Sequence, residues 1–464
     1  MVLTALSIYF KTCTGIIFIC PIHTSTNDSL ILTTLIKAGK IDLARQLSEV
    51  DSEPLAGVKS YSGFITVKEE YNSNLFFWYF PHEKTDKTPW IIWLEGGPGF
   101  TSLYGLFDII GPIKVEDGKV KRRNITWASD YSLLFIDNPV GVGFSFTDDD
   151  KGYPNNEDDV GEQLYEFLVQ FLQMFPELVQ APLIIAGQSY SGKYVPALGI
   201  QIHRHKDSLD PPINFKGISL GNPLIHPLGM MHYSELCTAM GLLDGKDLDT
   251  LKKLEKDTIT LIDGEQMVDA ANKFNETIEF IKKHSGVNVY NFNNDDLLLG
   301  GRSFEEFVVS PEVRSLIHAG PVSFDFNNQV VYTKMLPDIM NSTKPLVEEL
   351  LEHYGVMSYS GQLDVILPYS LSKRVYQTLQ WSRAEDYHQA PRHRLRNFSS
   401  NATVAYKKSG GNFVEVLVRH CGHLVPMEAP EVAKFILDLF INEYKSSNNN
   451  QHLLPKNLLN SKKC

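Results

Sequence analysis

A serine in the middle of the chain has the surroundings of an activated nucleophile. The apolar run Leu183–Ala186 leads directly into Gly187-Gln188-Ser189-Tyr190-Ser191-Gly192, and a helix is expected to follow. A strand, a tight turn and a helix around a serine form a nucleophile elbow, in which small neighbours let the hydroxyl project above a sheet. Ser191 stands where the G-x-S-x-G pattern has its second glycine. Taken alone, a segment of this kind is more often an ordinary loop.

A nucleophilic serine needs a base, and the base needs a carboxylate that orients it. In the α/β-hydrolase order, the aspartate and then the histidine follow the serine. Asp364 lies just beyond the apolar run Tyr354–Tyr359, and His423 lies just beyond the run Phe413–Val418. The order therefore favours Ser189, Asp364 and His423.

Two other residues compete for these roles. His420 is closer to the end of its strand than His423 and is more easily held by that strand. Asp137 also ends a strand, but it precedes the serine, which is the wrong order. A third residue, Cys421, suggests either a reactive thiol beside the site or a buried apolar cysteine, and we favour the buried cysteine.

The sequence gives little support for a metal, nucleotide or dinucleotide site. The five cysteines form no C-x-x-C pair, and the chain contains neither H-E-x-x-H nor G-x-x-x-x-G-K-[ST]. Gly97 and Gly99 could open a dinucleotide-binding loop, but Ser102 stands at its third glycine. We therefore expect no metal and no cofactor.

Composition narrows the class of protein further. The 464 residues suggest one to three domains at about 150 residues each, and 43% of them are apolar. The formal charge of −12 disfavours nucleic acid and acidic lipid surfaces as partners. No apolar run reaches the roughly 18 residues that a membrane span needs, so we expect a soluble protein.

The elements that must position the site follow from the apolar pattern. Helical periodicity is clear at 160–175, before Pro176, and again after Pro430. Runs that are apolar throughout are typical of strands buried on both faces of a parallel sheet. Strand and helix alternate, so we predict an α/β fold with a central, mostly parallel sheet flanked by helices. The expected strands are Ser62–Val67, Leu75–Phe80, Trp90–Leu94, Ser132–Ile136, Leu183–Ala186, Gly217–Leu220, Tyr354–Tyr359, Thr403–Tyr406 and Phe413–Val418.

Charged helical segments between 225 and 335 interrupt this alternation of strand and helix and predict a helical cap inserted into the fold. The resulting organisation is a signal peptide at 1–25, a first core part at 26–224, a helical cap at 225–335, a second core part at 336–445 and a disordered tail at 446–464. A buried helix is the alternative at the N-terminus. Whether a pro-segment within 26–59 is removed stays open.

Six N-x-[ST] sequons are consistent with the secretory pathway, where chance alone gives about two or three. They are Asn27, Asn124, Asn275, Asn341, Asn397 and Asn401. We expect a lysosomal or extracellular protein. The oligomeric state stays open, a homodimer included.

Several motifs in the same order resemble those of the serine carboxypeptidases of the α/β-hydrolase fold, and most closely the vitellogenic-like carboxypeptidases. The resemblance extends from about Ser60 to Phe440. Its motifs are WLEGGPG at 93–99, DNPVGVGFS at 137–145, the Ser189 elbow, SGQLD at 360–364 and GHLVP at 422–426. It implies a peptidase that removes single residues from peptides with a free C-terminus, without metal, through the triad Ser189, Asp364 and His423.

The resemblance also implies two groups of binding residues. The backbone N–H groups of Tyr190 and Gly96 would form the oxyanion hole, and glycine at 96 permits the close approach that this requires. The side chains of Trp93, Glu95 and Gln188 would hold the substrate's terminal carboxylate.

This chain departs from the family's pattern at those positions. Relatives usually carry an amide where Glu95 stands and a glutamate where Gln188 stands, so acid and amide are exchanged. The mixed pair survives, which favours retained carboxylate binding; a decayed site is the other interpretation. Phe100 replaces the family's cysteine in GGPGCSS, so any disulfide of that cysteine is absent here.

The sequence thus predicts a serine-type carboxypeptidase that acts through an acyl-enzyme at acid pH. Two alternatives remain. Plant relatives use the same framework for acyl transfer to an alcohol, and a non-catalytic secreted or lysosomal protein could use the cap to bind a partner.

Overall fold

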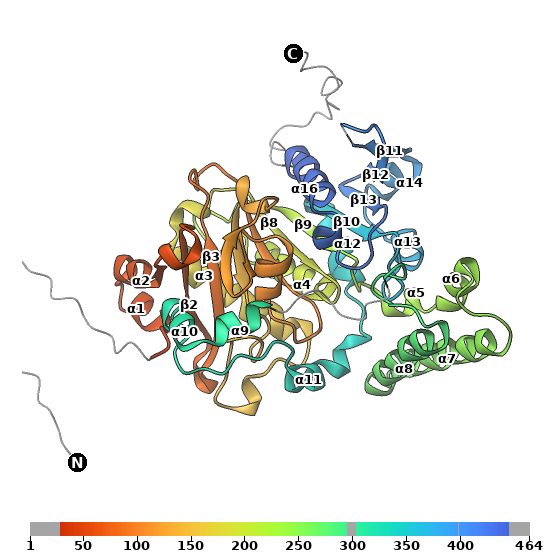
Figure 1. The fold of residues 1–464 in the computed structure, drawn as a ribbon, viewed down its shortest axis with the longest axis horizontal. Coiled ribbons are helices and arrows are strands. Elements are labelled where there is room, and N and C mark those ends of the chain that lie inside the picture. The colour runs from red at the N-terminus through yellow and green to blue at the C-terminus, as the bar shows by residue number, and fades with distance from the viewer. Residues whose placement is uncertain (1–27, 295–302, 398, 445–464) are drawn as a thin grey trace, which may run out of the picture.

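A large twisted sheet with helices on both faces organises the molecule (Figure 1). The computed structural model describes residues 28–294, 303–397 and 399–444. The eleven strands lie in the order β1 (Glu49–Val50), β2 (Ser60–Lys68), β3 (Ser73–Phe80), β7 (Ser132–Ile136), β4 (Trp90–Leu94), β8 (Leu183–Gln188), β9 (Phe215–Gly221), β10 (Gly355–Gly361), β13 (Phe413–Val418), β12 (Thr403–Gly410) and β11 (Arg392–Arg396).

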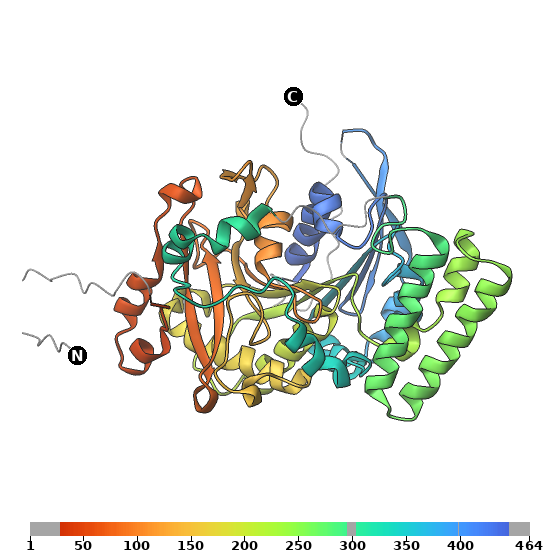
Figure 2. The ribbon, with the colours of Figure 1, turned by 60° about the horizontal axis from the view of Figure 1, so that its bottom comes forward.

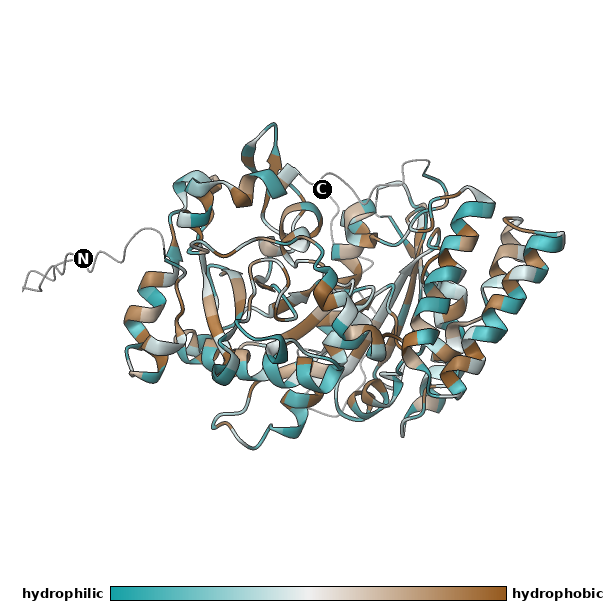
Figure 3. Cartoon of the chain, turned by 90° about the horizontal axis from the view of Figure 1, so that it is seen from below, coloured by the Kyte–Doolittle hydropathy of each residue, from teal (hydrophilic) through white to brown (hydrophobic). Residues whose placement is uncertain are grey.

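The middle of the sheet, from β7 to β13, is parallel, and both edges are antiparallel. This confirms the predicted fold class. Every residue of β4, β7 and β8 is buried, as expected for strands covered on both faces. Figure 3 shows these central strands as largely hydrophobic, whereas helices at the rim alternate hydrophilic and hydrophobic residues.

One face of the sheet is covered chiefly by α3 (Glu157–Met174), α4 (Ser191–Arg204) and α12 (Lys344–His353). The other is covered chiefly by α9 (Ser303–Val309), α16 (Pro430–Tyr444) and the π-helical turn Gly105–Ile109. The predicted start and end of α3 are confirmed. The Asn156 side chain accepts from the Asp159 N–H at 2.9 Å, and the helix ends two residues before Pro176.

The remaining elements are short or belong to the inserted segment. They are α1 (Thr33–Lys37), α2 (Ile41–Ser48), β5 (Ile113–Glu116), β6 (Lys119–Arg122), α5 (Pro227–Met230), α6 (Tyr233–Met240), α7 (Gly245–Asp263), α8 (Met267–Ser285), α10 (Pro311–Leu316), α11 (Gln329–Ile339), α13 (Tyr369–Tyr376), α14 (Ala384–Gln389) and α15 (Val425–Glu428).

The inserted segment does not pack as one layer. Helices α7 and α8 lie side by side at one end of the molecule, beyond the C-terminal strands (Figures 1 and 2). Helix α9 instead returns to the core, where the Phe304 ring stacks on Phe107 at 5.2 Å. The boundaries 225 and 335 stay a prediction, and the signal peptide at 1–25 and the tail at 446–464 lie outside the described residues.

The buried side chain of Lys193 links α4 to the end of α11 and the segment that follows it. The Lys193 ammonium, which is 0% exposed, donates to the carbonyls of Asp338 at 2.6 Å and Asn341 at 2.7 Å. Its nitrogen also lies 3.5 Å from Asp338 Oδ2. Burial and the nearby Asp338 charge raise the pKa of Glu157, which lies in the same cluster.

Candidate active site

The nucleophile elbow forms at the carboxyl end of β8. Ser189 has φ of 62°, the left-handed conformation expected of the central residue of such a turn, and its N–H donates to the Gly221 carbonyl at 2.8 Å. A side chain on Gly187 would put its Cβ 2.5 Å from the Leu94 carbonyl oxygen. The Ser191 hydroxyl donates to that same oxygen at 2.8 Å, so a small hydroxyl residue fits the fifth position of the elbow.

The predicted base and carboxylate lie together at the same edge of the sheet. His423 Nδ1 is 2.7 Å from Asp364 Oδ2, and the two residues are 3% and 2% exposed. A proton on Nδ1 makes it the donor to Asp364 and leaves Nε2 as the acceptor that a general base needs. Nε2 is buried and has no hydrogen-bond partner among the described residues.

The amide of Asn222 is a residue that the sequence reasoning missed. It follows β9, and its Nδ2 donates to Asp364 Oδ2 at 2.5 Å, the oxygen that also contacts His423. The N–H of Leu367 donates to Asp364 Oδ1 at 3.1 Å. Asn222 directly follows Gly221, whose carbonyl accepts from the backbone N–H of Ser189. The signal that could have revealed Asn222 is its position as a polar residue directly after a buried parallel strand.

The histidine loop is held from two sides. The His423 N–H donates to the Tyr290 carbonyl at 2.7 Å, and the two rings meet edge to face at 5.4 Å. The Glu428 carboxylate accepts from the N–H of Gly422 at 2.9 Å and of Leu424 at 3.4 Å. These bonds fix the backbone on both sides of the histidine.

The structure places the competing residues differently. His420 is exposed and has φ of 62°. Asp137 is buried and accepts from Thr101 Oγ1 at 2.5 Å and from the N–H groups of Ser102 at 3.1 Å and Phe144 at 2.9 Å, so it braces the glycine-rich loop. Cys421 is buried, and burial raises the pKa of its thiol, which favours the buried apolar cysteine over a reactive one.

Three donors converge on the carboxyl group of Glu95. Gln188 Nε2 donates to Oε1 at 2.8 Å, Trp93 Nε1 donates to Oε2 at 3.1 Å, and the Gly96 N–H lies 3.3 Å from Oε1. Burial raises the pKa of Glu95 to about 7, and these hydrogen bonds and the His423 charge oppose the shift only in part. The acid and the amide are therefore in direct contact, and the acid holds its proton in mildly acidic solution.

Backbone N–H groups lie beside the nucleophile. A Cβ added to Gly96 would be 2.8 Å from Ser189 Cβ and 2.9 Å from the Tyr190 nitrogen, so Gly96 and Tyr190 are in close contact. The Gly96 N–H already faces Glu95. The next residue, Gly97, has φ of 122°, and its N–H donates to no acceptor within the described part of the chain. Gly97 is thus a second candidate donor, which the sequence reasoning did not single out.

Comparison with known proteins assigns the family. A sequence profile described as "Serine carboxypeptidase" matches residues 51–443. The chain belongs to the serine carboxypeptidase family. It is 38% identical to the venom serine carboxypeptidase of Apis mellifera over 88% of this chain and 89% of that protein. It is 37% identical to the vitellogenic carboxypeptidase of Aedes aegypti, over 90% of this chain and 91% of that one.

The fold agrees with this family. The crystal structure of the prohormone-processing carboxypeptidase Kex1(Δ)p of Saccharomyces cerevisiae superposes with a TM-score of 0.78 and 23% identity, covering 86% of this chain and 96% of that one. The protein is therefore a serine-type carboxypeptidase with an α/β-hydrolase fold that acts on peptides.

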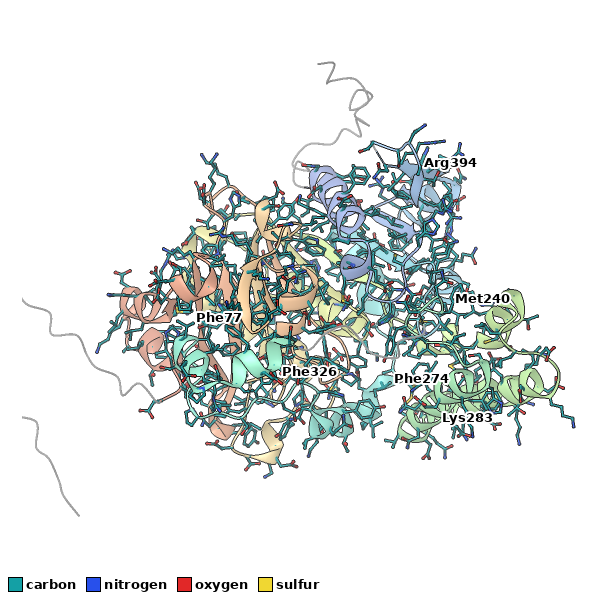
Figure 4. All side chains as sticks on the ribbon, viewed as in Figure 1. Phe77, Met240, Phe274, Lys283, Phe326 and Arg394 are labelled. Atoms are coloured by element: carbon teal, nitrogen blue, oxygen red, sulfur yellow. The ribbon has the colours of Figure 1, made fainter. Side chains whose placement is uncertain are left out.

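A pocket of about 240 Å³ opens between α8 and the loop that supports the carboxypeptidase's histidine. Tyr290 lines it and touches His423, and Ile366 lies two residues after Asp364. Figure 4 shows Phe274, another lining residue, which belongs to α8. The lining is mixed: Phe274, Asn275, Ile278, Glu279, Lys282, Asn288, Val289, Tyr290 and Ile366.

The remaining expectations concern modification and membranes. Asn124, Asn275, Asn341 and Asn401 are exposed, Asn397 is half-buried, and Asn27 lies outside the described residues. No group of three acidic, histidine or cysteine side chains within the described ranges is arranged to hold a metal. In the same part of the chain, no helix is long and apolar enough to cross a bilayer.

Proposed function

We propose that this carboxypeptidase cleaves the last peptide bond of its substrates through an acyl-enzyme in which Ser189 is the nucleophile. The observation that carries the proposal is the pair His423–Asp364 at 2.7 Å, with no partner for Nε2 of the histidine among the described residues, together with a serine at φ of 62° after the parallel strand β8. His423 takes the proton of the serine hydroxyl as Ser189 attacks the carbonyl carbon. It then returns that proton to the departing amine. Water hydrolyses the ester in a second, equivalent step.

Charge on the tetrahedral intermediate would be stabilised by the Tyr190 N–H at the start of α4 together with an N–H of the glycine-rich loop. Gly96 is the sequence-based candidate for the second donor, and the neighbouring Gly97 has an N–H without an acceptor among the residues that the structure describes. A helix N-terminus adds its dipole to the same oxygen.

The proposed reader of the terminal carboxylate is the buried set Trp93, Glu95 and Gln188. Only a protonated Glu95 can donate a hydrogen bond to a carboxylate, because two ionised carboxyl groups in contact repel each other. Since the pKa of Glu95 is raised to about 7, the proposal favours catalysis in mildly acidic solution. Together with the predicted signal peptide and sequons, this points to the secretory pathway, lysosomal or extracellular.

A serine-directed phosphonate followed by peptide mapping tests the nucleophile, and a peptide library followed by mass spectrometry tests the reaction. We expect a single label on Ser189 and sequential loss of C-terminal residues. Transfer of an acyl group to an added alcohol in preference to water would favour the acyltransferase alternative. Absence of both label and product would favour the binding-protein alternative.

A further inference from the structure

The outer edge of the sheet at β11, two strands beyond β13, carries a row of cations, although the protein has a formal charge of −12. We call this row the basic strip. Figure 4 shows Arg394 projecting from this outer edge. The strip comprises Arg392, Arg394 and Arg396 of β11, Lys408 of β12 and Arg419 directly after β13.

The strand register places four of these side chains on one face, while Arg396 follows a register shift after Leu395 and lies at the end of the row. Arg392 pairs with Lys408 and Arg394 with Tyr406, and paired residues of adjacent strands point to the same side of a sheet. Tyr406 in turn pairs with Leu417, two residues before Arg419. Alternate residues of a strand share a face, so Arg419 continues the row across the third strand. Lys407, by contrast, points to the opposite face and pairs with Glu443 at 3.1 Å.

The charges of the strip are not neutralised within the described part of the protein. None of its five members has a carboxylate at ion-pair distance there. The nearest acid on this face by register is Glu415, which pairs with Lys408 in the ladder. Glu415 is 2% exposed and is bound by the Tyr369 hydroxyl, the Tyr387 hydroxyl and the Lys373 ammonium at 2.5 Å.

Four of the five cationic groups make contacts that hold them in place. The Arg392 guanidinium stacks over the Tyr406 ring at 4.6 Å and lies 5.5 Å from the Tyr369 ring. The Lys408 ammonium donates to the His388 carbonyl at 3.0 Å. Arg396 and Arg419 donate to the carbonyls of Asn401 and Thr403 at 2.9 and 3.0 Å. Each group still has N–H donors left, since a guanidinium carries five and an ammonium three.

We propose that the basic strip binds a linear sulfated polysaccharide. Guanidinium groups bind planar oxyanion edges through paired hydrogen bonds, and four of the five cations are arginines. Alternate residues along a strand are about 6.6 Å apart, so the strip offers evenly spaced cations to an anionic chain that lies along it.

The form of the strip disfavours the other polyanions. A membrane surface or a nucleic-acid duplex would extend beyond the strip, over a protein with net negative charge. Membrane attachment also needs exposed apolar side chains, and the large hydrophobic residues exposed in the described ranges, Val268, Val309 and Val330, belong to other elements. A thin, flexible chain can remain within the strip. Because the strip lies beyond the strands that carry the triad, binding there leaves the active site open.

The test compares full-length variants in binding to a size-defined heparin oligosaccharide by fluorescence anisotropy over a series of salt concentrations. The test variant is Arg392→Gln/Arg394→Gln/Lys408→Gln. The matched control is Lys252→Gln/Lys253→Gln/Lys256→Gln on the exposed side of α7, which changes the net charge equally. We expect the test variant to raise Kd at least tenfold at about 150 mM salt. It should also lower the slope of log Kd against log salt by about three, one for each cation removed. The control should stay within about twofold of wild type.

Peptidase activity of each variant reports folding. The conservative variant Arg392→Lys/Arg394→Lys keeps charge and removes the paired hydrogen bonds, so it should bind with intermediate affinity even if the neutral variant is unstable. The proposal is overturned if wild type does not bind heparin, or if desulfated heparin binds equally well. An equal loss in the control variant, or equally tight binding of duplex DNA or anionic vesicles, also overturns it.

Discussion

Replacing Glu95 by glutamine should remove the pH dependence of substrate binding. In the structure Glu95 accepts hydrogen bonds from Gln188 and Trp93, and burial raises its pKa to about 7. Below that value the carboxyl group is neutral and can donate to a substrate carboxylate. Above it, the group is ionised and repels the same carboxylate. The variant leaves two neutral amides at any pH, so its KM should be nearly constant.

The size of the effect follows from the fraction of enzyme that carries the proton. With a pKa of about 7, roughly nine-tenths of the molecules are protonated at pH 6 and roughly one-tenth at pH 8. Apparent affinity scales with the competent fraction, so KM of wild type should rise about tenfold between those values. A hydrogen bond to a charged group is worth about 1.5–3 kcal/mol, which allows a change of this size.

The assay measures kcat and KM from pH 4 to 8 with a free-acid peptide and with the same peptide amidated at its C-terminus. The amide carries no charge and serves as the substrate control. Its KM should be high and should change little with pH. The double variant Glu95→Gln/Gln188→Glu moves the acid to the other side of the pair and should restore a KM that rises with pH. If Glu95→Gln keeps the wild-type KM profile, Glu95 is not the proton-bearing contact.

Four further outcomes test the rest of the site. Ser189→Ala should lower peptide release by several orders of magnitude with unchanged circular dichroism, and a residual rate above about one-hundredth of wild type would contradict its role. Asn222→Ala should lower kcat about ten- to a hundredfold with little change in KM, because the triad carboxylate loses a charged hydrogen bond; equal changes in kcat and KM would indicate a general structural defect. The raised pKa of Glu95 means that the folded state retains a proton that the unfolded chain releases between about pH 4.5 and 7. Stability should therefore fall as pH rises through that window, by up to about 3 kcal/mol, and Glu95→Gln should flatten the curve of melting temperature against pH. Lys193→Met should lower the free energy of unfolding, measured with denaturant, by about 3–5 kcal/mol, because it leaves buried carboxylates without their countercharge. Lys252→Met on the surface should lower it little.

The core of the fold could be predicted from the sequence because its strands are buried on both faces. The predicted runs Trp90–Leu94, Ser132–Ile136 and Phe413–Val418 coincide with β4, β7 and β13. The edge strand β11 was missed because its sequence, RHRLR, is almost wholly exposed and carries no apolar pattern. Its ladder partner β12 holds it in place, which only the three-dimensional structure reveals.

The candidate site also contains some residues that the sequence could predict and others that it could not. Ser189 and the predicted partners His423 and Asp364 follow buried strands, so their place at one edge of the sheet could be anticipated. Asn222 was missed because its role depends on a side-chain direction at φ of 41°. The direct contact between Glu95 and Gln188 also depends on strand pairing, and neither the burial of the acid nor its raised pKa can be read from the motif alone.

The pairing of β4 with β8 accounts for an enzyme that removes one residue at a time. In the parallel register Leu94 lies opposite Gly187, so the next residues along the two strands are Glu95 and Gln188, and the residues after those include Ser189. Gln188 of the proposed carboxylate reader and the proposed nucleophile Ser189 are thus consecutive residues, with Cα atoms about 3.8 Å apart. Consecutive residues of a peptide are about 3.8 Å apart. A substrate whose terminal carboxylate meets the proposed reader therefore presents its last peptide carbonyl near Ser189, and a longer segment beyond that bond would meet the buried side chains of Glu95 and Gln188.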